Sequence, residues 1–205
     1  MTMKITILSC LIISALLLAI APFFIGLGYD WLRDTTSESA AQNSPNAWIA
    51  RAGFAFYAIG IFIFSFSAPP PNNLRYLPFA ISMIFVATWS TAPIFDGHRY
   101  DPIENFLHSV GANLVGISFI LAVISSQFAE QRRSKIVRAF DLFAILVSIL
   151  IPLVMGRVYS VRGLTQRLMF LISYTWFAME VFINPPEKWV AVQRDEIEDS
   201  SNSHH

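Results

Sequence analysis

Six long apolar segments, separated by short polar connections, constrain the fold of this chain more than any other feature. A helix needs about 20 mostly apolar residues to cross the hydrocarbon core of a bilayer. Segments that meet this requirement lie at residues 5–28, 47–67, 74–94, 105–128, 137–155 and 163–183. The sequence therefore predicts an all-α fold, a polytopic integral membrane protein whose residues 1–186 form one six-helix bundle. Residues 187–205 are predicted to be a disordered, acidic cytoplasmic tail.

The composition supports a membrane protein. Of the 205 residues 55% are hydrophobic and 14% are charged, whereas soluble domains carry about 25% charged residues. The formal net charge is zero, so no overall positive field attracts nucleic acid, and we exclude that class of partner. Cys10 is the one cysteine in the sequence, which excludes an intrachain disulfide.

The distribution of Lys and Arg indicates the orientation. Cytoplasmic connections of membrane proteins carry an excess of these residues. With the N-terminus inside, eight of the 14 lie on the inner side, and the densest cluster, at residues 132–135, lies in a short inner connection. The outer six are Arg33, Arg51, Arg99, Arg157, Arg162 and Arg167. We predict a multi-pass protein of the cell inner (plasma) membrane with both termini in the cytoplasm.

This orientation gathers polar groups of both signs on the extracytoplasmic side. They come from the connections after the first, third and fifth segments. They are Asp30, Trp31, Arg33, Asp34, Asp96, His98, Arg99, Tyr100, Asp101, Glu104, His108, Arg157, Tyr159, Arg162, Gln166 and Arg167. We expect a polar cup lined mainly by the third and fifth connections, with a contribution from the first.

The start of the fourth segment has the pattern of a helix N-terminus. Asp101 is a favourable N-cap, Pro102 occupies the first helical position, and Glu104 follows at the third. This is the arrangement of a capping box, in which the cap and the third residue bond to each other's backbone. Capping alone accounts for Asp101.

His108 has no such explanation. It lies four residues after Glu104 on the same helical face, which Ala112 and Gly116 continue with small residues. Such a stripe lets a second helix approach closely, so we expect His108 to point into the bundle. An ionisable group there is a functional candidate. The alternative is a neutral histidine that forms a hydrogen bond between helices.

Two arginines flank the first turn of the last segment. Arg162 and Arg167 lie where the helix dipole is already positive, so they need a negative partner. The alternatives are Asp96, Asp101 and Glu104 within the protein, the phosphates of outer-leaflet lipid, or a bound anion.

Metal binding is a weaker interpretation of the acids and histidines on this side. Zinc accepts ligands of the kind that Asp96, Glu104, His98 and His108 supply, but their spacing matches no established motif. We therefore predict no cofactor and keep zinc at His98 and His108 as the alternative.

Two further acids, Asp141 and Glu180, lie within apolar segments about one turn from the cytoplasmic end. Long polar side chains so placed can reach the interface. We expect both acids to be solvated at helix ends. A proton relay through them is the weaker interpretation.

Short motifs suggest a family. They are residues 48–54 (WIARAGF), Phe95-Asp96 followed by Asp101 and His108, and residues 163–167 (GLTQR) with Trp176. In these the chain resembles the bacterial six-span proteins of domain-of-unknown-function family 998, which is distantly similar to the FRAG/DRAM/SFK-like membrane proteins. The resemblance implies six helices and roles for His108, Gln166 and Arg167, and it brings no activity. His98 and Arg99 do not match the family's pattern.

The sequence favours a binding protein. Arg162, Gln166 and Arg167 would hold a lipid headgroup or small anionic ligand, and Asp96, Glu104 and His108, with Asp101 nearby, would orient them. Membrane lipid, a membrane-protein partner and a second copy of the chain are the expected partners.

Two alternatives remain open. The first is a membrane-embedded enzyme acting on a lipid or apolar metabolite, in which His108 is the base or a metal ligand and Asp96 or Glu104 its carboxylate partner. The second is a small-molecule transporter. It has less support, since the sequence shows no repeat or broken span.

Overall fold

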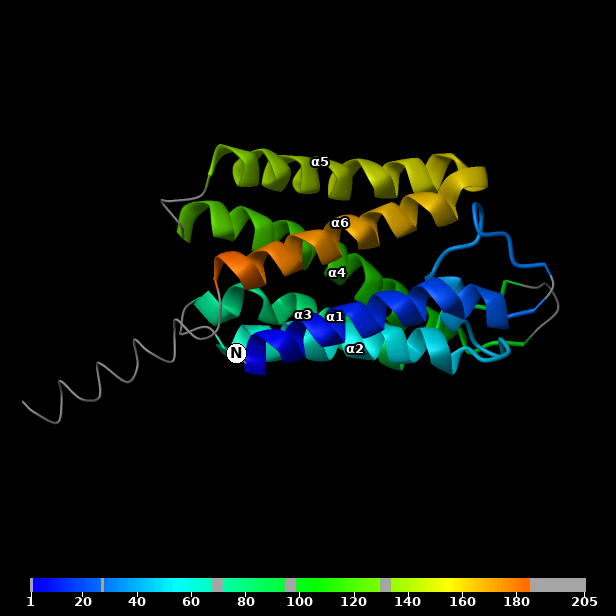
Figure 1. Cartoon of the computed structure of the whole chain (residues 1–205). Helices are drawn as coiled ribbons and strands as arrows, with labels where there is room; N and C mark the ends of the chain where they lie inside the picture. The colour runs from blue at the N-terminus through cyan, green and yellow to red at the C-terminus, as the bar shows by residue number, and fades with distance from the viewer. Residues whose placement is uncertain (1, 27, 68–71, 95–98, 130–133, 185–205) are drawn as a thin grey trace, which may run out of the picture.

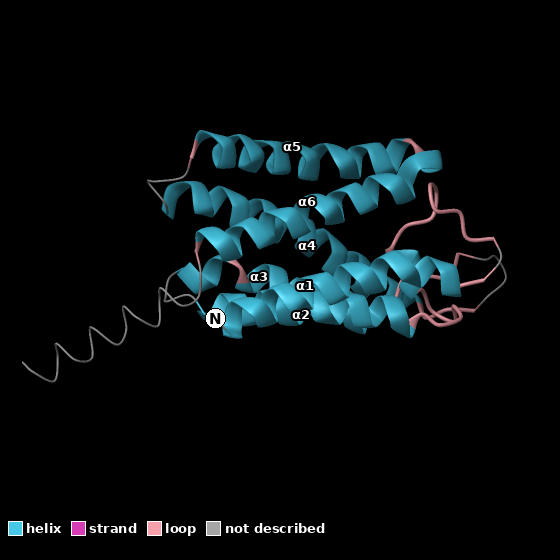
Figure 2. Cartoon of the chain, in the orientation of Figure 1, coloured by secondary structure: helices cyan, strands magenta, loops and turns pink. Residues whose placement is uncertain are grey.

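The computed structural model of the chain describes residues 2–26, 28–67, 72–94, 99–129 and 134–184. Within these residues the chain forms α-helices, short 3-10 turns and no strand (Figures 1 and 2). The six α-helices are α1 (Thr2–Ile20), α2 (Trp48–Ser67), α3 (Leu77–Thr88), α4 (Pro102–Ala129), α5 (Lys135–Arg157) and α6 (Arg162–Ile183). The all-α prediction is therefore confirmed.

Four helical segments are long and apolar enough to cross a membrane. They are Met3–Phe24, Trp48–Ser67, Pro102–Phe128 and Lys135–Arg157. Large apolar side chains cover their outer faces. Ile12, Leu121 and Leu153 each expose more than half of their surface. Hydrocarbon is the natural surrounding of such faces, so these segments have the character of transmembrane helices.

The third and sixth predicted segments differ from the other four. α3 has 12 residues, about 18 Å of helix, which is shorter than the hydrocarbon core of about 30 Å. It ends early because Trp89 adopts an extended backbone (φ −99°, ψ 142°). α6 has 22 residues but is less apolar than the four, because it contains Arg167 and Glu180.

Connections that alternate along the sequence gather at the same end of the bundle (Figure 1). The described parts of residues 29–47, 89–101 and 158–161 lie at one end, which we call the loop end. The N-terminus, the turn at residues 72–76 and the last residues of α6 lie at the other, which we call the terminal end. Neighbouring helices therefore run in opposite directions.

An aromatic core joins four of the helices. Tyr57 of α2, Phe79 of α3, Phe119 of α4, and Trp176 and Phe177 of α6 are all nearly inaccessible. The Phe79 and Phe177 ring centroids are 4.7 Å apart, and those of Phe119 and Trp176 are 5.4 Å apart. Such pairs add roughly 0.5–1.5 kcal/mol each beyond the area that they bury. The core therefore fixes α6 at the centre of the bundle.

The two acids expected at solvated helix ends are fully buried, so that prediction is wrong. Asp141 and Glu180 each expose 0% of their surface. Asp141 accepts hydrogen bonds from the indole N–H of Trp176, at 2.7 Å, and from the side-chain amide of Gln127. Glu180 accepts a hydrogen bond from the Tyr76 hydroxyl at 2.8 Å. Both helices turn these acids toward the bundle, where polar partners replace water.

Candidate functional site at the loop end

The first connection, residues 29–47, folds into the loop end instead of covering its surface. Its buried residues are Asp34, Thr35, Thr36, Ser37, Ser39, Ala40, Ala41, Gln42 and Ala47. A connection can be buried only if its backbone groups find partners. Here the amide of Asp30 donates to the Asp34 carboxylate at 2.8 Å, and that of Thr35 donates to Glu38 at 2.6 Å. The loop's own acids therefore satisfy part of its backbone.

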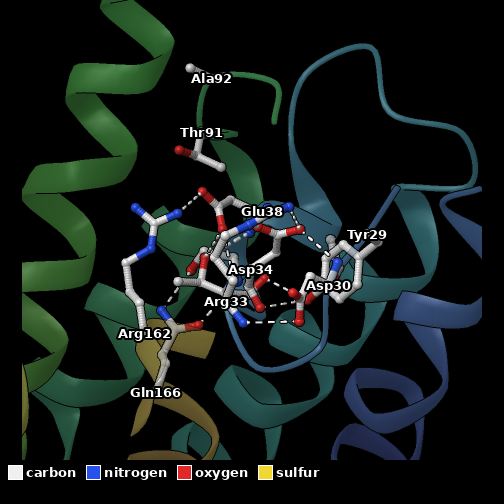
Figure 3. Close-up of polar contacts among 12 residues, drawn as sticks. Tyr29, Asp30, Arg33, Asp34, Glu38, Thr91, Ala92, Arg162 and Gln166 are labelled. Carbon is white, nitrogen blue, oxygen red and sulfur yellow. Dashed lines mark hydrogen bonds and ion pairs between the residues drawn. The ribbon is translucent and has the colours of Figure 1, made fainter. Parts of the chain in front are cut away.

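The first turns of α6 bind this connection through side chains. Arg162 donates to the Glu38 carboxylate at 2.5 Å, and both side chains are largely buried. The side-chain oxygen of Gln166 accepts from the Ser37 amide and its nitrogen donates to the Ser37 hydroxyl, each at 3.3 Å. Figure 3 shows Arg162 and Gln166 pointing toward the first connection. The negative partner of Arg162 is thus Glu38 of the first connection, which was not among the acids expected from the third.

Arg167 also binds the first connection, but through carbonyl and hydroxyl oxygens and not through a carboxylate. Its Nη1 donates to the carbonyl oxygens of Trp31, at 2.7 Å, and Asp34, at 3.0 Å. Its Nη2 donates to the Tyr29 hydroxyl at 2.5 Å, and its guanidinium lies 4.1 Å from the centre of the Trp31 ring. A guanidinium has five N–H donors, so two remain after these three bonds. Among the described residues no carboxylate forms an ion pair with Arg167.

The acids near Arg167 are engaged elsewhere. Asp34, which is fully buried, forms an ion pair with Arg33 at 2.8 Å. Burial alone would raise the pKa of the Asp34 carboxyl, but the hydrogen bonds from Arg33 and from the Asp30 amide outweigh it and lower that pKa below its ordinary value. Asp30 accepts from the amide of Leu32 at 2.9 Å. Neutral oxygens therefore surround the positive charge of Arg167.

An apolar cleft of about 210 Å³ opens between α1 and α6 beside this arginine. Its lining is formed by Ala15, Leu18, Ala19, Trp31, Thr36, Arg167, Phe170, Leu171 and Tyr174. Leu171, on the rim, exposes 62% of its surface. The cleft thus combines apolar walls with one cation at its loop end.

The third connection forms a second polar group, which Gln42 joins to the first connection. Asp101 caps α4, because its carboxylate accepts from the amides of Ile103, at 2.8 Å, and Glu104, at 3.3 Å. The reciprocal half of the expected capping box is absent. The Glu104 carboxylate instead accepts from the Ser90 amide at 2.8 Å, and the Asp101 amide donates to Gln42 at 2.7 Å. Glu104 therefore fixes the chain beyond α3, which explains why α3 stops at Thr88.

His108 points into the bundle, as the sequence predicted. It exposes 4% of its surface, and its Nδ1 lies 2.8 Å from the carbonyl oxygen of Trp89. No described contact joins it to Gln166 or Arg167, which bind the first connection instead. The expected single cup is therefore two groups, one around Arg167 and one around His108. Asp96 and His98 lie outside the described residues.

The stripe of small residues after His108 does not receive a helix, so that interpretation is wrong. A Cβ atom added at Gly116 would meet nothing within 4 Å. Ala112 and Gly116 instead line a cavity of about 80 Å³. The close helix contact is made by Gly111, where an added Cβ would lie 2.9 Å from the Cβ of Phe85 on α3. Successive residues rotate by about 100° around a helix, so Gly111 and Gly116 face different neighbours.

No metal centre can be assembled from the part of the chain that the structure describes. There, no three side chains of His, Cys, Asp or Glu converge. Two of the four zinc candidates, Asp96 and His98, lie outside that part. Of the other two, Glu104 binds the Ser90 amide and His108 binds the Trp89 carbonyl.

Sequence reasoning gave the first connection too small a role. Tyr29, Ser37 and Glu38 provide the side-chain partners of the first turns of α6, and none was a predicted site residue. One signal was present: two arginines at a helix N-terminus need acids, and residues 29–47 contain three. Their burial could not be deduced, since polar connections are usually at the surface.

An all-helical bundle with transmembrane character and a polar loop end defines the class of this protein. The sequence matches the profile of a family described as "Protein of unknown function (DUF998)" over residues 9–182. The chain belongs to this family, as the motifs around Arg51, His108 and Arg167 predicted. No curated protein and no solved structure matches it. The more distant similarity to FRAG/DRAM/SFK-like proteins stays a prediction.

Proposed function

We propose that this protein binds an anionic membrane lipid, whose headgroup lies at Arg167 and whose acyl chain lies in the cleft between α1 and α6. The observation that carries the proposal is that Arg167 lies at the mouth of an apolar cleft and has no carboxylate partner among the described residues. Arg162, by contrast, is neutralised by Glu38. Of the two arginines at the start of α6, Arg167 is therefore the one available to an anion.

The two ends of the cleft match the two parts of a lipid. Arg167 has two N–H donors beyond those that bind Trp31, Asp34 and Tyr29, and phosphate oxygens are strong acceptors of such bonds. The remaining lining is largely apolar and its rim is exposed, as Leu171 shows. An acyl chain can enter such a cleft directly from the bilayer, without crossing the bundle.

Native mass spectrometry of the purified protein tests this proposal. Phosphatidylglycerol and phosphatidylcholine would be titrated separately into the protein in a neutral detergent. We expect phosphatidylglycerol to bind about tenfold more tightly, which corresponds to about 1.4 kcal/mol. Both headgroups contain a phosphate, but only that of phosphatidylglycerol has a net negative charge, since choline cancels the charge of the other beside Arg167. Arg167→Gln should abolish this preference. Arg157→Gln, which changes an exposed arginine at the same end, is the matched control and should retain it.

A second variant separates lipid binding from support of the loop, since Arg167 also holds the first connection. Ala19→Trp fills the exposed rim of the cleft without removing any bond of Arg167. It should weaken binding of phosphatidylglycerol while the melting temperature stays unchanged. Equal binding of both lipids by the wild-type protein, or unaltered preference in Arg167→Gln, would refute the proposal.

We further propose six membrane passes in the cell inner membrane, with both termini in the cytoplasm. The alternation of connections between the two ends of the bundle supports an even number of passes (Figure 1). The short α3 would complete its pass through the turn Asn72–Arg75 and the extended chain after Thr88. Ser134→Cys at the terminal end should resist an impermeant thiol reagent on intact cells, whereas Tyr100→Cys at the loop end should react. The opposite pattern would reverse the orientation.

His108 supports a second candidate, a membrane-embedded enzyme. If its Nδ1–H donates to the Trp89 carbonyl, Nε2 is left as an acceptor, which is the arrangement of a general base. Lipid extracts from cells that overproduce the wild-type protein would be compared with extracts from cells that overproduce His108→Gln. A product that only the wild-type protein forms, with equal levels of folded protein, would establish this activity. Identical extracts would leave His108 as a structural hydrogen-bonding residue.

A further inference from the structure

A second cavity lies on the other side of α6, beneath the first connection. It has a volume of about 80 Å³, several times the roughly 10–15 Å³ that one water molecule requires. The side chains that line it come from α3, α4, α5, α6 and the buried loop. They include Met83, Val115, Phe119, Met169 and Phe170, and none of the lining residues is charged.

The sequence keeps this space open with small side chains on α4. Ala112 and Gly116 line the cavity, and an added Cβ at Gly116 would meet no atom within 4 Å. Ala112 is exposed and Gly116 is partly buried, so the cavity opens at the surface of the bundle at these positions. The space is therefore a property of the residues at these two positions.

A free hydroxyl faces this apolar space. Ser148 of α5 lines the cavity and exposes only 7% of its surface. Most helical serines of this chain donate to a carbonyl of the preceding turn, as Ser118 does. Ser148 makes no side-chain hydrogen bond within the described residues, and its oxygen is not sealed from the cavity. The hydroxyl offers one donor and two acceptor positions in a side chain that is otherwise buried, so it can bond to a molecule in the cavity.

We propose that this cavity binds an uncharged molecule with an apolar chain and one terminal hydroxyl or carbonyl group. The polar group would bond to Ser148, and the chain would lie against Phe119, Met83 and Met169. A charged ligand is excluded because no lining residue could compensate its charge. The site differs from the one at Arg167 in position and in ligand chemistry, so either can be disproved without the other.

Photolabelling with 1-hexanol that carries a diazirine on its chain tests the proposal. The full-length protein in detergent would be irradiated at increasing probe concentrations, and the adducts mapped by peptide mass spectrometry. We expect saturable labelling of peptides that contain Met83, Phe119 and Met169, displaced by unlabelled 1-hexanol. Labelling at lipid-facing residues such as Leu121 should rise linearly, because it reflects partition into the micelle.

Gly116→Leu should abolish the saturable labelling, since its side chain fills the cavity, and should preserve or raise the melting temperature. Gly156→Leu is the matched control. It adds the same side chain at an exposed glycine of α5 with equally open space, and labelling should persist.

Ser148→Ala should weaken the apparent affinity for the alcohol about three- to tenfold, as expected for one hydrogen bond. It should not affect a diazirine-labelled hexane, which has no polar group. Linear labelling of the cavity peptides in the wild-type protein, or saturable labelling that persists in Gly116→Leu, would overturn the proposal. The cavity would then contain water or nothing.

Discussion

Arg162 and Glu38 form an ion pair, 2.5 Å long, that ties the start of α6 to a connection 124 positions earlier in the chain. Their side chains expose 24% and 16% of their surface, respectively. Partly buried pairs of this kind stabilise only when both members are present, because either charge alone has lost its water. The ion pair therefore makes the buried loop and the sixth helix dependent on each other.

A double-mutant cycle measures this dependence. Arg162→Ala should lower the free energy of unfolding in detergent by roughly 1–3 kcal/mol, since it strands the Glu38 carboxylate. Glu38→Ala should do the same, and the double variant should lose less than the sum of the two. Arg157→Ala, at an exposed arginine, should have no effect. Additive losses at residues 38 and 162 would mean that the pair contributes nothing.

Gly163 is expected to tolerate no side chain. An added Cβ would overlap the carbonyl group of Asp34, with its carbon atom 2.9 Å away, and would lie 2.8 Å from Nη1 of Arg167. Gly163→Ala should therefore destabilise the protein by about 1–3 kcal/mol or more, the usual cost of overpacking. Gly116→Ala is the matched control, because its Cβ would enter open space. Thermal unfolding in detergent should separate the two variants clearly.

Asp34 should make stability sensitive to acid. Its folded pKa is lowered, so its contribution is complete above its unfolded pKa of about 3.9. The contribution is lost as the pH falls through the lower, folded pKa. Between about pH 5 and pH 3, the melting temperature of the wild-type protein should fall more steeply than that of Asp34→Asn. Parallel curves would show that this carboxylate is not a source of stability.

The hydrogen bond from Trp176 to Asp141 should contribute to the stability of the bundle near the terminal end. Trp176→Phe removes the indole N–H that lies 2.7 Å from the fully buried carboxylate, and should cost about 1–3 kcal/mol. Trp176→Phe combined with Asp141→Leu removes both members of this bond and should recover part of that loss, reduced by the cost of the Gln127 amide that loses its acceptor. Chemical unfolding in detergent with increasing dodecyl sulfate would measure each step. No recovery in the double variant would indicate that Asp141 depends mainly on its other partners.

The helices could be predicted from the sequence, because a long apolar run leaves the backbone few alternatives in a membrane. Their ends were less predictable. α3 stops at Thr88 because the Ser90 amide binds Glu104, which lies on another helix. No local pattern around residues 88–90 records that bond. The end of α3 is thus set by a tertiary hydrogen bond, which the hydrophobic periodicity of the sequence does not indicate.

The candidate site was predictable in its residue types and less so in its pairings. His108 was expected to point inward, and it does so. Arg162 was expected to meet an acid of the third connection, a lipid phosphate or a bound anion, and its partner proves to be Glu38 of the first connection. The direction in which a helical face points drifts by about 40° with every four residues. The stripe that begins at His108 therefore reaches a cavity by Gly116 and not a second helix.

The burial of the first connection has a consequence for exchanging segments between members of the family. The carbonyl of Leu32 accepts the amide of Leu164 at 3.0 Å, and the Asp34 carbonyl occupies the space that only a glycine at position 163 leaves open. A chimera that receives residues 29–47 from a relative would keep this packing only if the start of α6 has a glycine at position 163 and side chains that fit the new loop. Residues 29–47 and the start of α6 should therefore be exchanged together, although more than a hundred residues separate them in the sequence.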